Sequence, residues 1–147
     1  MKLALGTAQF GLAYGIANNL GLVPIEEVRG ILRQAEHSGM NVLDTAITYG
    51  VCEQRLGDIG VAGWKVVSKL PVAPDTCGDV ASWVACSVEE SLARLRVNRL
   101  YGLLLHRPNQ LSGPHGGCLY RALQELKKSG VVEKIGVSVY DPSELDA

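Results

Sequence analysis

Apolar residues follow two alternating spacings along the chain. Short apolar runs, each typical of a buried strand, lie at residues 2–5, 41–44, 65–70, 100–105 and 134–139. Between these runs, apolar residues recur every three or four positions, which predicts helices at 24–38, about 51–59, 79–96 and around 119–126. This alternation of strands and helices is typical of an α/β protein.

The predicted helices carry suitable residues at their ends. Pro24 suits a first helical turn, Gly39 suits the position after a last turn, and Asp79 can cap the helix that follows it. The segment from Gly6 to Val23 lacks such a pattern and is predicted to be a long loop. Loops of that length are usually functional or disordered, so this one is a candidate to line a site.

The type of sheet follows from the strands themselves. An uncharged run such as YGLLL, at 101–105, suits a strand that is buried on both faces of a parallel sheet. A parallel sheet with intervening helices is either doubly wound or a (β/α) barrel of the TIM type. No shift in composition divides the chain, so residues 1–147 are predicted to form one domain.

The last residues bear on the size of that domain. Asp141-Pro142-Ser143-Glu144 combines an N-cap acid, a proline at the first helical position and a glutamate at the third, which predicts a new helix. An eight-stranded barrel takes about 250 residues, so this chain has room for about five βα units. The sequence therefore predicts a truncated parallel α/β domain of about five βα units, either doubly wound or of the (β/α) TIM-barrel type.

Composition narrows the class of partner and the compartment. A net charge of −1, without clustered Lys or Arg, argues against nucleic acid and against an anionic membrane. Residues 3–25 carry no charge, but they are too rich in Gly and Asn to span a bilayer. Four cysteines without a CxxC pair predict neither a disulfide framework nor a metal site, but reduced thiols that fill the core of a cytoplasmic protein.

Polar residues stand at the predicted strand ends, where ligands bind in parallel α/β folds. They are Thr7 after the first strand, Asp44 after the second, Lys69 near the end of the third, His106 after the fourth and Ser138 near the end of the fifth. Gly6 precedes Thr7 at the first strand end. Tyr49 lies on the loop after the second strand. In a sheet that curves into a barrel, these side chains face one opening.

The chemistry of four of these residues is coherent. A phenol, with an ordinary pKa of about 10, is a poor proton donor near neutrality, and a nearby ammonium favours the phenolate. A carboxylate keeps the ammonium charged, and an imidazole can orient a carbonyl oxygen or relay a proton. Asp44, Tyr49, Lys69 and His106 could thus donate a proton to a carbonyl that receives a hydride.

Each residue alone also has a structural interpretation. Asp44 could be a turn former, Tyr49 a packed aromatic in a turn, Lys69 a solvated strand end and His106 a loop histidine. Their common position, each at the same end of its element, is what favours a shared site. His37 and His115 have no such setting.

Five segments resemble the aldo-keto reductase family, in order and at plausible spacing. They are LGTAQFG (5–11), LDTAITYGVCEQRLG (43–57), VVSKLP (66–71), SLARLRVNRLYGLLLHRP (91–108) and EKIGVSVY (133–140). The second is the most specific, since DTAxxYGxxExxLG is close to a family signature. The resemblance implies a (β/α)8 barrel, of which residues 1–147 would be the N-terminal portion, truncated after about five strands. It also implies an oxidoreductase that reduces aldehydes and ketones with NADPH, or runs the reverse reaction.

The resemblance also implies roles. Tyr49 would be the general acid, Lys69 the ammonium that assists it, Asp44 the partner of Lys69, and His106 the residue that orients the carbonyl. Gly6, Thr7 and Ser138 match positions near the nicotinamide end of the cofactor, with Asp44 beside them. Val139 stands where the family usually has Asn.

Two functions therefore remain open. The chain is either a carbonyl reductase or an inactive or regulatory half-barrel, because the family holds the cofactor's phosphates and adenosine with the last third of its barrel. Open sheet edges and apolar inner faces further predict that a five-stranded piece self-associates. The sequence does not name the carbonyl substrate.

Overall fold

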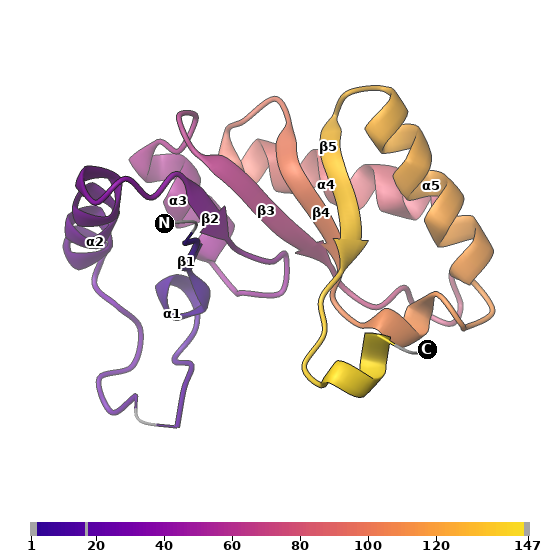
Figure 1. Cartoon of the computed structure of the whole chain (residues 1–147), viewed down its shortest axis with the longest axis horizontal. Coiled ribbons are helices and arrows are strands. Elements are labelled where there is room, and N and C mark those ends of the chain that lie inside the picture. The colour runs from indigo at the N-terminus through magenta and orange to yellow at the C-terminus, as the bar shows by residue number, and fades with distance from the viewer. Residues whose placement is uncertain (1–2, 17, 146–147) are drawn as a thin grey trace.

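Five parallel strands form a single sheet in the order β1-β2-β3-β4-β5 (Figure 1). The computed structural model describes residues 3–16 and 18–145. The strands are β1 (Leu5–Gly6), β2 (Val42–Asp44), β3 (Lys65–Leu70), β4 (Leu100–Leu105) and β5 (Val132–Val137). Because all strands are parallel, their carboxyl ends share one edge, as the sequence predicted.

Helices connect the strands and cover one face of the sheet. They are α1 (Ala8–Gly11), α2 (Ile25–His37), α3 (Cys52–Ile59), α4 (Val80–Leu95) and α5 (Gly116–Lys128), with 3₁₀ turns η1 (Pro108–Gln110) and η2 (Pro142–Leu145). The main hydrophobic core includes Leu43, Leu56, Leu70, Leu103, Val84 and Leu119, drawn from three strands and three helices. Their burial removes the apolar stripes of the helices from water and fixes the helices on the sheet.

Backbone pairing extends past the strands at the carboxyl edge. Thr7 N donates to Asp44 O at 3.0 Å, Thr45 N to Val67 O at 2.9 Å, and His106 N to Leu70 O at 3.0 Å. These hydrogen bonds pair the backbone of the residues that follow the strands with the neighbouring strands. This extension gives the polar residues at the edge a rigid support.

Two predicted helix signals are confirmed, while Pro24, expected in the first turn of a helix, lies at the N-cap position just before α2. Asp79 caps α4 by accepting a hydrogen bond from Ser82 N at 3.0 Å, and Gly39 has a φ of +79° just beyond α2. At the C-terminus, Glu144 accepts from Asp141 N at 3.2 Å in a capping-box arrangement. The turn that follows is 3₁₀ over the described residues.

Several predicted boundaries were wrong. β1 comprises Leu5–Gly6 rather than 2–5, of which residue 2 lies outside the described residues, and β5 comprises Val132–Val137 rather than 134–139. The expected loop from Gly6 to Val23 contains the short helix α1.

The prediction that the cysteines fill the core holds only in part. Cys52 is buried, but Cys86 and Cys118 are exposed. An exposed helix position accepts a small side chain such as cysteine without any contact to the core.

Over the part of the chain that the structure describes, no helix is long and apolar enough to cross a membrane. Within the same residues, no group of three or more His, Cys, Asp or Glu side chains is placed to hold a metal ion.

Candidate active site

Lys69 joins two strand ends at the carboxyl edge of the sheet. Its side chain is 5% exposed and lies on β3 beside β2. The ammonium group donates to the Asp44 carboxylate and, at 3.0 Å, to the Thr45 carbonyl oxygen. A buried ammonium needs such partners to stay charged, and the strand register supplies both of them.

Tyr49 reaches the same ammonium from the loop after β2. Its hydroxyl oxygen lies 3.5 Å from Lys69 Nζ, which also sits 5.1 Å from the centre of the phenol ring. Gly50, with a φ of +55°, turns the chain immediately after it. A Cβ at Gly11 would lie 1.8 Å from the Tyr49 carbonyl oxygen, so the α1 segment packs directly against this turn and holds the tyrosine in place.

His106 follows β4 and completes the group. Its ring meets the ring of Tyr49 edge to face, with the centroids 5.9 Å apart and an interplanar angle of 77°. Its Nδ1 lies 3.1 Å from Thr48 Oγ1. Burial, then the positive charges of Lys69 and Arg107, lower the pKa of His106 from its ordinary value, against a smaller opposing effect of Asp44. This shift favours the neutral form of the imidazole.

Gly6 and Thr7 line a cavity next to this group. The cavity, of about 330 Å³, reaches Asp44 and Tyr49 and is bounded on its other side by Tyr14 and neighbouring residues of the loop after β1. Thr7 is fully buried, and its hydroxyl donates to the Asp44 carbonyl oxygen at 2.9 Å. A Cβ at Gly6 would meet nothing within 4 Å, so the space above this residue is open to a ligand.

Ser138 is placed differently from the other predicted site residues. It follows β5, and its backbone N donates to Leu105 O at 2.9 Å, next to His106. The structure thus brings Asp44, Tyr49, Lys69 and His106 together, puts Gly6 and Thr7 beside them, and places Ser138 on the neighbouring strand end after β5, where its backbone pairs beside His106.

The sequence did not reveal the network around Glu53. This carboxylate is 2% exposed, and it accepts hydrogen bonds from Ser68 Oγ at 2.8 Å, Ser91 Oγ at 2.6 Å and Arg94 Nε at 2.9 Å. It ties α3 and α4 to the residue that precedes Lys69. The available signal in the sequence was that Glu53 stands on the same helix as the apolar residues Cys52 and Leu56, which are buried in the structure.

Arg55 orders the long loop after β1. Its Nη1 donates to the carbonyl oxygens of Phe10 at 3.0 Å and Val23 at 2.8 Å, and so closes the two ends of the loop against α3. The arginine was predictable as a helical residue but not as a loop anchor, since its partners lie 45 and 32 positions away.

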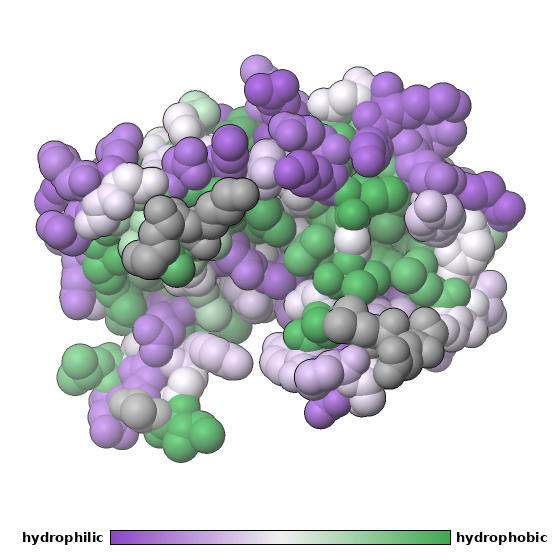
Figure 2. Space-filling model, in the orientation of Figure 1, coloured by the Kyte–Doolittle hydropathy of each residue, from purple (hydrophilic) through white to green (hydrophobic). Residues whose placement is uncertain are grey.

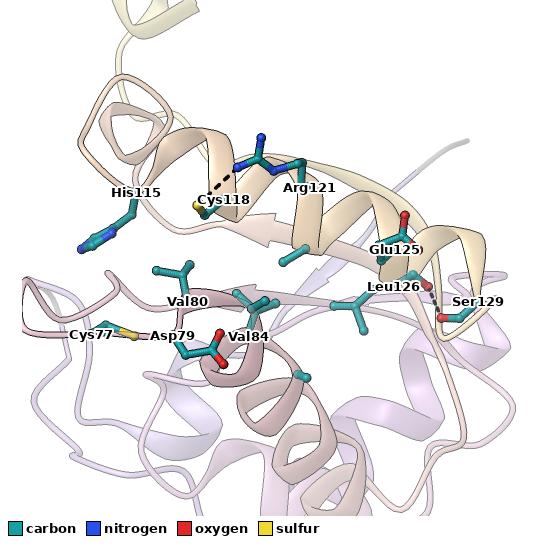
Figure 3. A pocket seen from close by; sticks show the side chains of 14 residues that line it. Cys77, Asp79, Val80, Val84, His115, Cys118, Arg121, Glu125, Leu126 and Ser129 are labelled. Atoms are coloured by element: carbon teal, nitrogen blue, oxygen red, sulfur yellow. Dashed lines mark hydrogen bonds between the residues drawn. The ribbon is translucent and has the colours of Figure 1, made fainter.

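A larger cavity, of about 630 Å³, lies in the helical layer rather than at the strand ends. Figure 3 shows it between the start of α4, with Val80 and Val84, and the face of α5 that carries Cys118 and Leu126. Its lining is mainly apolar, and a hydrogen bond joins Arg121 Nη2 to Cys118 Sγ at 3.5 Å. It does not contain the acid, phenol, amine and imidazole that meet at the strand ends.

Together, the site holds the groups needed for proton transfer to a carbonyl oxygen. It combines a phenol, an ammonium with a carboxylate partner and an imidazole around one open space. The fold and this set of groups define a (β/α) protein with a candidate active site at the carboxyl edge of its sheet, where ligands bind in such folds.

The chain matches the model of the Aldo/keto reductase family over residues 2–147, and it belongs to that family. The 6-dehydroglucose reductase of Novosphingobium aromaticivorans is 28% identical over 160 residues, which cover 97% of this chain and 51% of the relative. A Pseudomonas aeruginosa structure assigned to the aldo-keto reductases gives a TM-score of 0.76 at 30% identity, covering 92% of this chain and 54% of the other.

A third similar structure contains the cofactor NADPH. An aldo-keto reductase from Klebsiella pneumoniae in complex with NADPH gives a TM-score of 0.67 at 22% identity, covering 97% of this chain and 47% of the other. The chain spans about half the length of these relatives. The parallel (β/α)-barrel type predicted from the sequence is confirmed, with five strands present.

Proposed function

We propose that this chain carries the proton-donating site of an NAD(P)H-dependent oxidoreductase that reduces aldehyde or ketone carbonyls to alcohols. The proposal rests on one observation. The buried ammonium of Lys69 donates to the Asp44 carboxylate and also lies beside the Tyr49 hydroxyl. Membership of the aldo-keto reductase family supports the reaction class.

Each of the four residues has a proposed role in the reduction. Tyr49 donates its hydroxyl proton to the carbonyl oxygen, and Lys69 stabilises the phenolate that forms. Asp44 keeps the ammonium of Lys69 charged in a buried position. His106, neutral and packed against the Tyr49 ring, offers a second donor that orients the carbonyl oxygen.

The residues present fit the nicotinamide end of the cofactor. Gly6 leaves open space above it, Thr7 and Asp44 border the same cavity, and Ser138 follows the neighbouring part of the edge. The bound cofactor supplies the hydride for the carbonyl carbon. NADPH is the proposed form, since the family resemblance implies it and the structure of the Klebsiella pneumoniae relative contains it. A cytoplasmic setting, with reduced thiols, suits this chemistry.

Replacing the proposed acid tests the function. Tyr49→Phe removes only the hydroxyl, and we expect NADPH-dependent carbonyl reduction to fall by about 10² to 10⁴-fold, the usual contribution of a general acid. Tyr120→Phe, at an exposed position on α5, is the matched control. Unchanged carbonyl reduction in Tyr49→Phe would remove Tyr49 from the proposal.

A fluorescence titration separates this function from its alternative. Micromolar binding of NADPH by the 147-residue chain would argue against an inactive or regulatory module. A chain that folds but gives no binding and no carbonyl reduction would favour the module instead.

A further inference from the structure

The loops after β2 and β4 meet through Thr48 and His106. Thr48 Oγ1 lies 3.1 Å from His106 Nδ1, although the two residues are 58 positions apart in the chain. Thr48 directly precedes Tyr49, so the proposed acid and the hydroxyl that contacts the imidazole are neighbours on one turn. Any shift of this turn moves both groups together.

A neutral imidazole has one nitrogen that donates and one that accepts. The charged and titratable groups around His106 are Lys69 of β3, Asp44 of β2, Tyr49 of the loop after β2 and Arg107 next in the chain. Burial and the two cations disfavour the imidazolium. These effects favour a ring with a single proton. The Thr48 hydroxyl can donate to Nδ1, which requires the proton on Nε2, or accept from it.

We infer that Thr48 is a positioning residue that donates its hydroxyl proton to His106 Nδ1 and thereby stabilises the tautomer with the proton on Nε2. The inference rests on the proposed carbonyl reduction and assigns it a further residue. In this tautomer Nε2–H and the Tyr49 hydroxyl can both donate to one carbonyl oxygen. In the other tautomer Nε2 would present a lone pair to that oxygen, and it would compete for the proton of Tyr49.

The side chain at position 48 allows a clean test. Thr48→Val has nearly the same shape without the hydroxyl, Thr48→Ser keeps the hydroxyl, and Thr76→Val is a control at another exposed threonine. Long-range ¹H–¹⁵N spectra of the imidazoles report which nitrogen is protonated, and His106→Gln assigns the signals among the three histidines. This measurement needs neither cofactor nor substrate.

We expect the Nε2–H tautomer of His106 in the unsubstituted chain and in Thr48→Ser, and a shift toward Nδ1–H in Thr48→Val. We also expect kcat/KM for the carbonyl to fall about tenfold in Thr48→Val, the effect of one lost hydrogen bond, while Thr48→Ser and Thr76→Val stay within about twofold. An Nδ1–H tautomer in the unsubstituted chain, or an unchanged tautomer in Thr48→Val, would overturn the inference. If the tautomer shifts as expected but no form reduces carbonyls, the proposed function fails and the placement of Thr48 stands.

Discussion

Lys69 Nζ lies 3.5 Å from the hydroxyl oxygen of Tyr49, at a point where β3 and the loop after β2 meet. The same ammonium donates to the Thr45 carbonyl oxygen at 3.0 Å, so backbone as well as side chain fixes its position. A cation held in this way beside a phenol does not have to reorganise when charge develops on the phenol oxygen, which is the condition for effective electrostatic assistance.

Removal of this cation is expected to abolish most of the activity. Lys69→Met keeps the length of a buried side chain but leaves Tyr49 without the adjacent charge, so carbonyl reduction should fall by about 10² to 10⁴-fold. Steady-state oxidation of NADPH measures the effect. Lys65→Met, at an exposed position of the same strand, is the control. Equal activity in the two variants would contradict the role of Lys69.

The Glu53 network is expected to hold the strand that carries Lys69. Glu53→Ala leaves the buried hydroxyls of Ser68 and Ser91 without their acceptor, and urea unfolding should show a loss of about 2–4 kcal/mol. Glu90→Ala removes an exposed partner of Arg94 instead and should change the free energy of unfolding by less than about 1 kcal/mol. If both variants lost a similar free energy of unfolding, the buried hydrogen bonds of Glu53 would not stabilise the fold more than the exposed contact of Glu90.

Two glycines should respond in opposite directions to alanine. A Cβ at Gly57 would lie 2.0 Å from the Arg94 carbonyl oxygen, so Gly57→Ala forces α3 away from α4 and should cost about 1–3 kcal/mol. Gly30 lies inside α2 with nothing within 4 Å of its Cβ position, so Gly30→Ala should stabilise the helix by about 0.5–1 kcal/mol. Thermal unfolding of both variants checks the pair, and the prediction fails if Gly57→Ala is neutral.

His106 is expected to titrate below its ordinary pKa of 6.5. The folded chain then binds fewer protons than the unfolded chain as the pH falls below 6.5, so this group makes the fold less stable in that range. The imidazole C–H signals followed between pH 4 and 8 give the midpoint, with His106→Gln for assignment. A midpoint at or above 6.5 would contradict the buried, cation-flanked setting.

The apolar edge of the sheet is expected to drive self-association of the 147-residue chain. β5 is the last strand of the sheet order, and hydrophobic side chains gather over β5 and the adjoining face of α5 in Figure 2. Such a surface favours association, since it lies next to an edge of β5 that pairs with no other strand of the described residues. Light scattering over a concentration series should show dimers or larger species. A well-folded monomer at high concentration would contradict this.

The sequence predicted elements best where local pattern alone decides them. β3 and β4 match the predicted ranges 65–70 and 100–105, because an apolar run bounded by polar residues specifies such a strand without reference to its partner. β1 and β5 were misplaced because their limits depend on pairing, Leu5 with Leu43 and Leu100 with Val132. The helix α1 was missed since Arg55, far along the chain, anchors the segment that contains it.

The sequence by itself determined which chemical groups stand at the strand ends and in what order. An acid, a phenol, an amine and an imidazole follow successive strands, and parallel pairing brings consecutive strand ends to one edge. Only the tertiary structure decided which atoms meet: Lys69 with the Thr45 carbonyl, Thr48 with His106, and Glu53 with two buried serines. Those contacts depend on strand register, side-chain rotamers and helix packing, which arise between residues distant in the chain and leave no local pattern in the sequence.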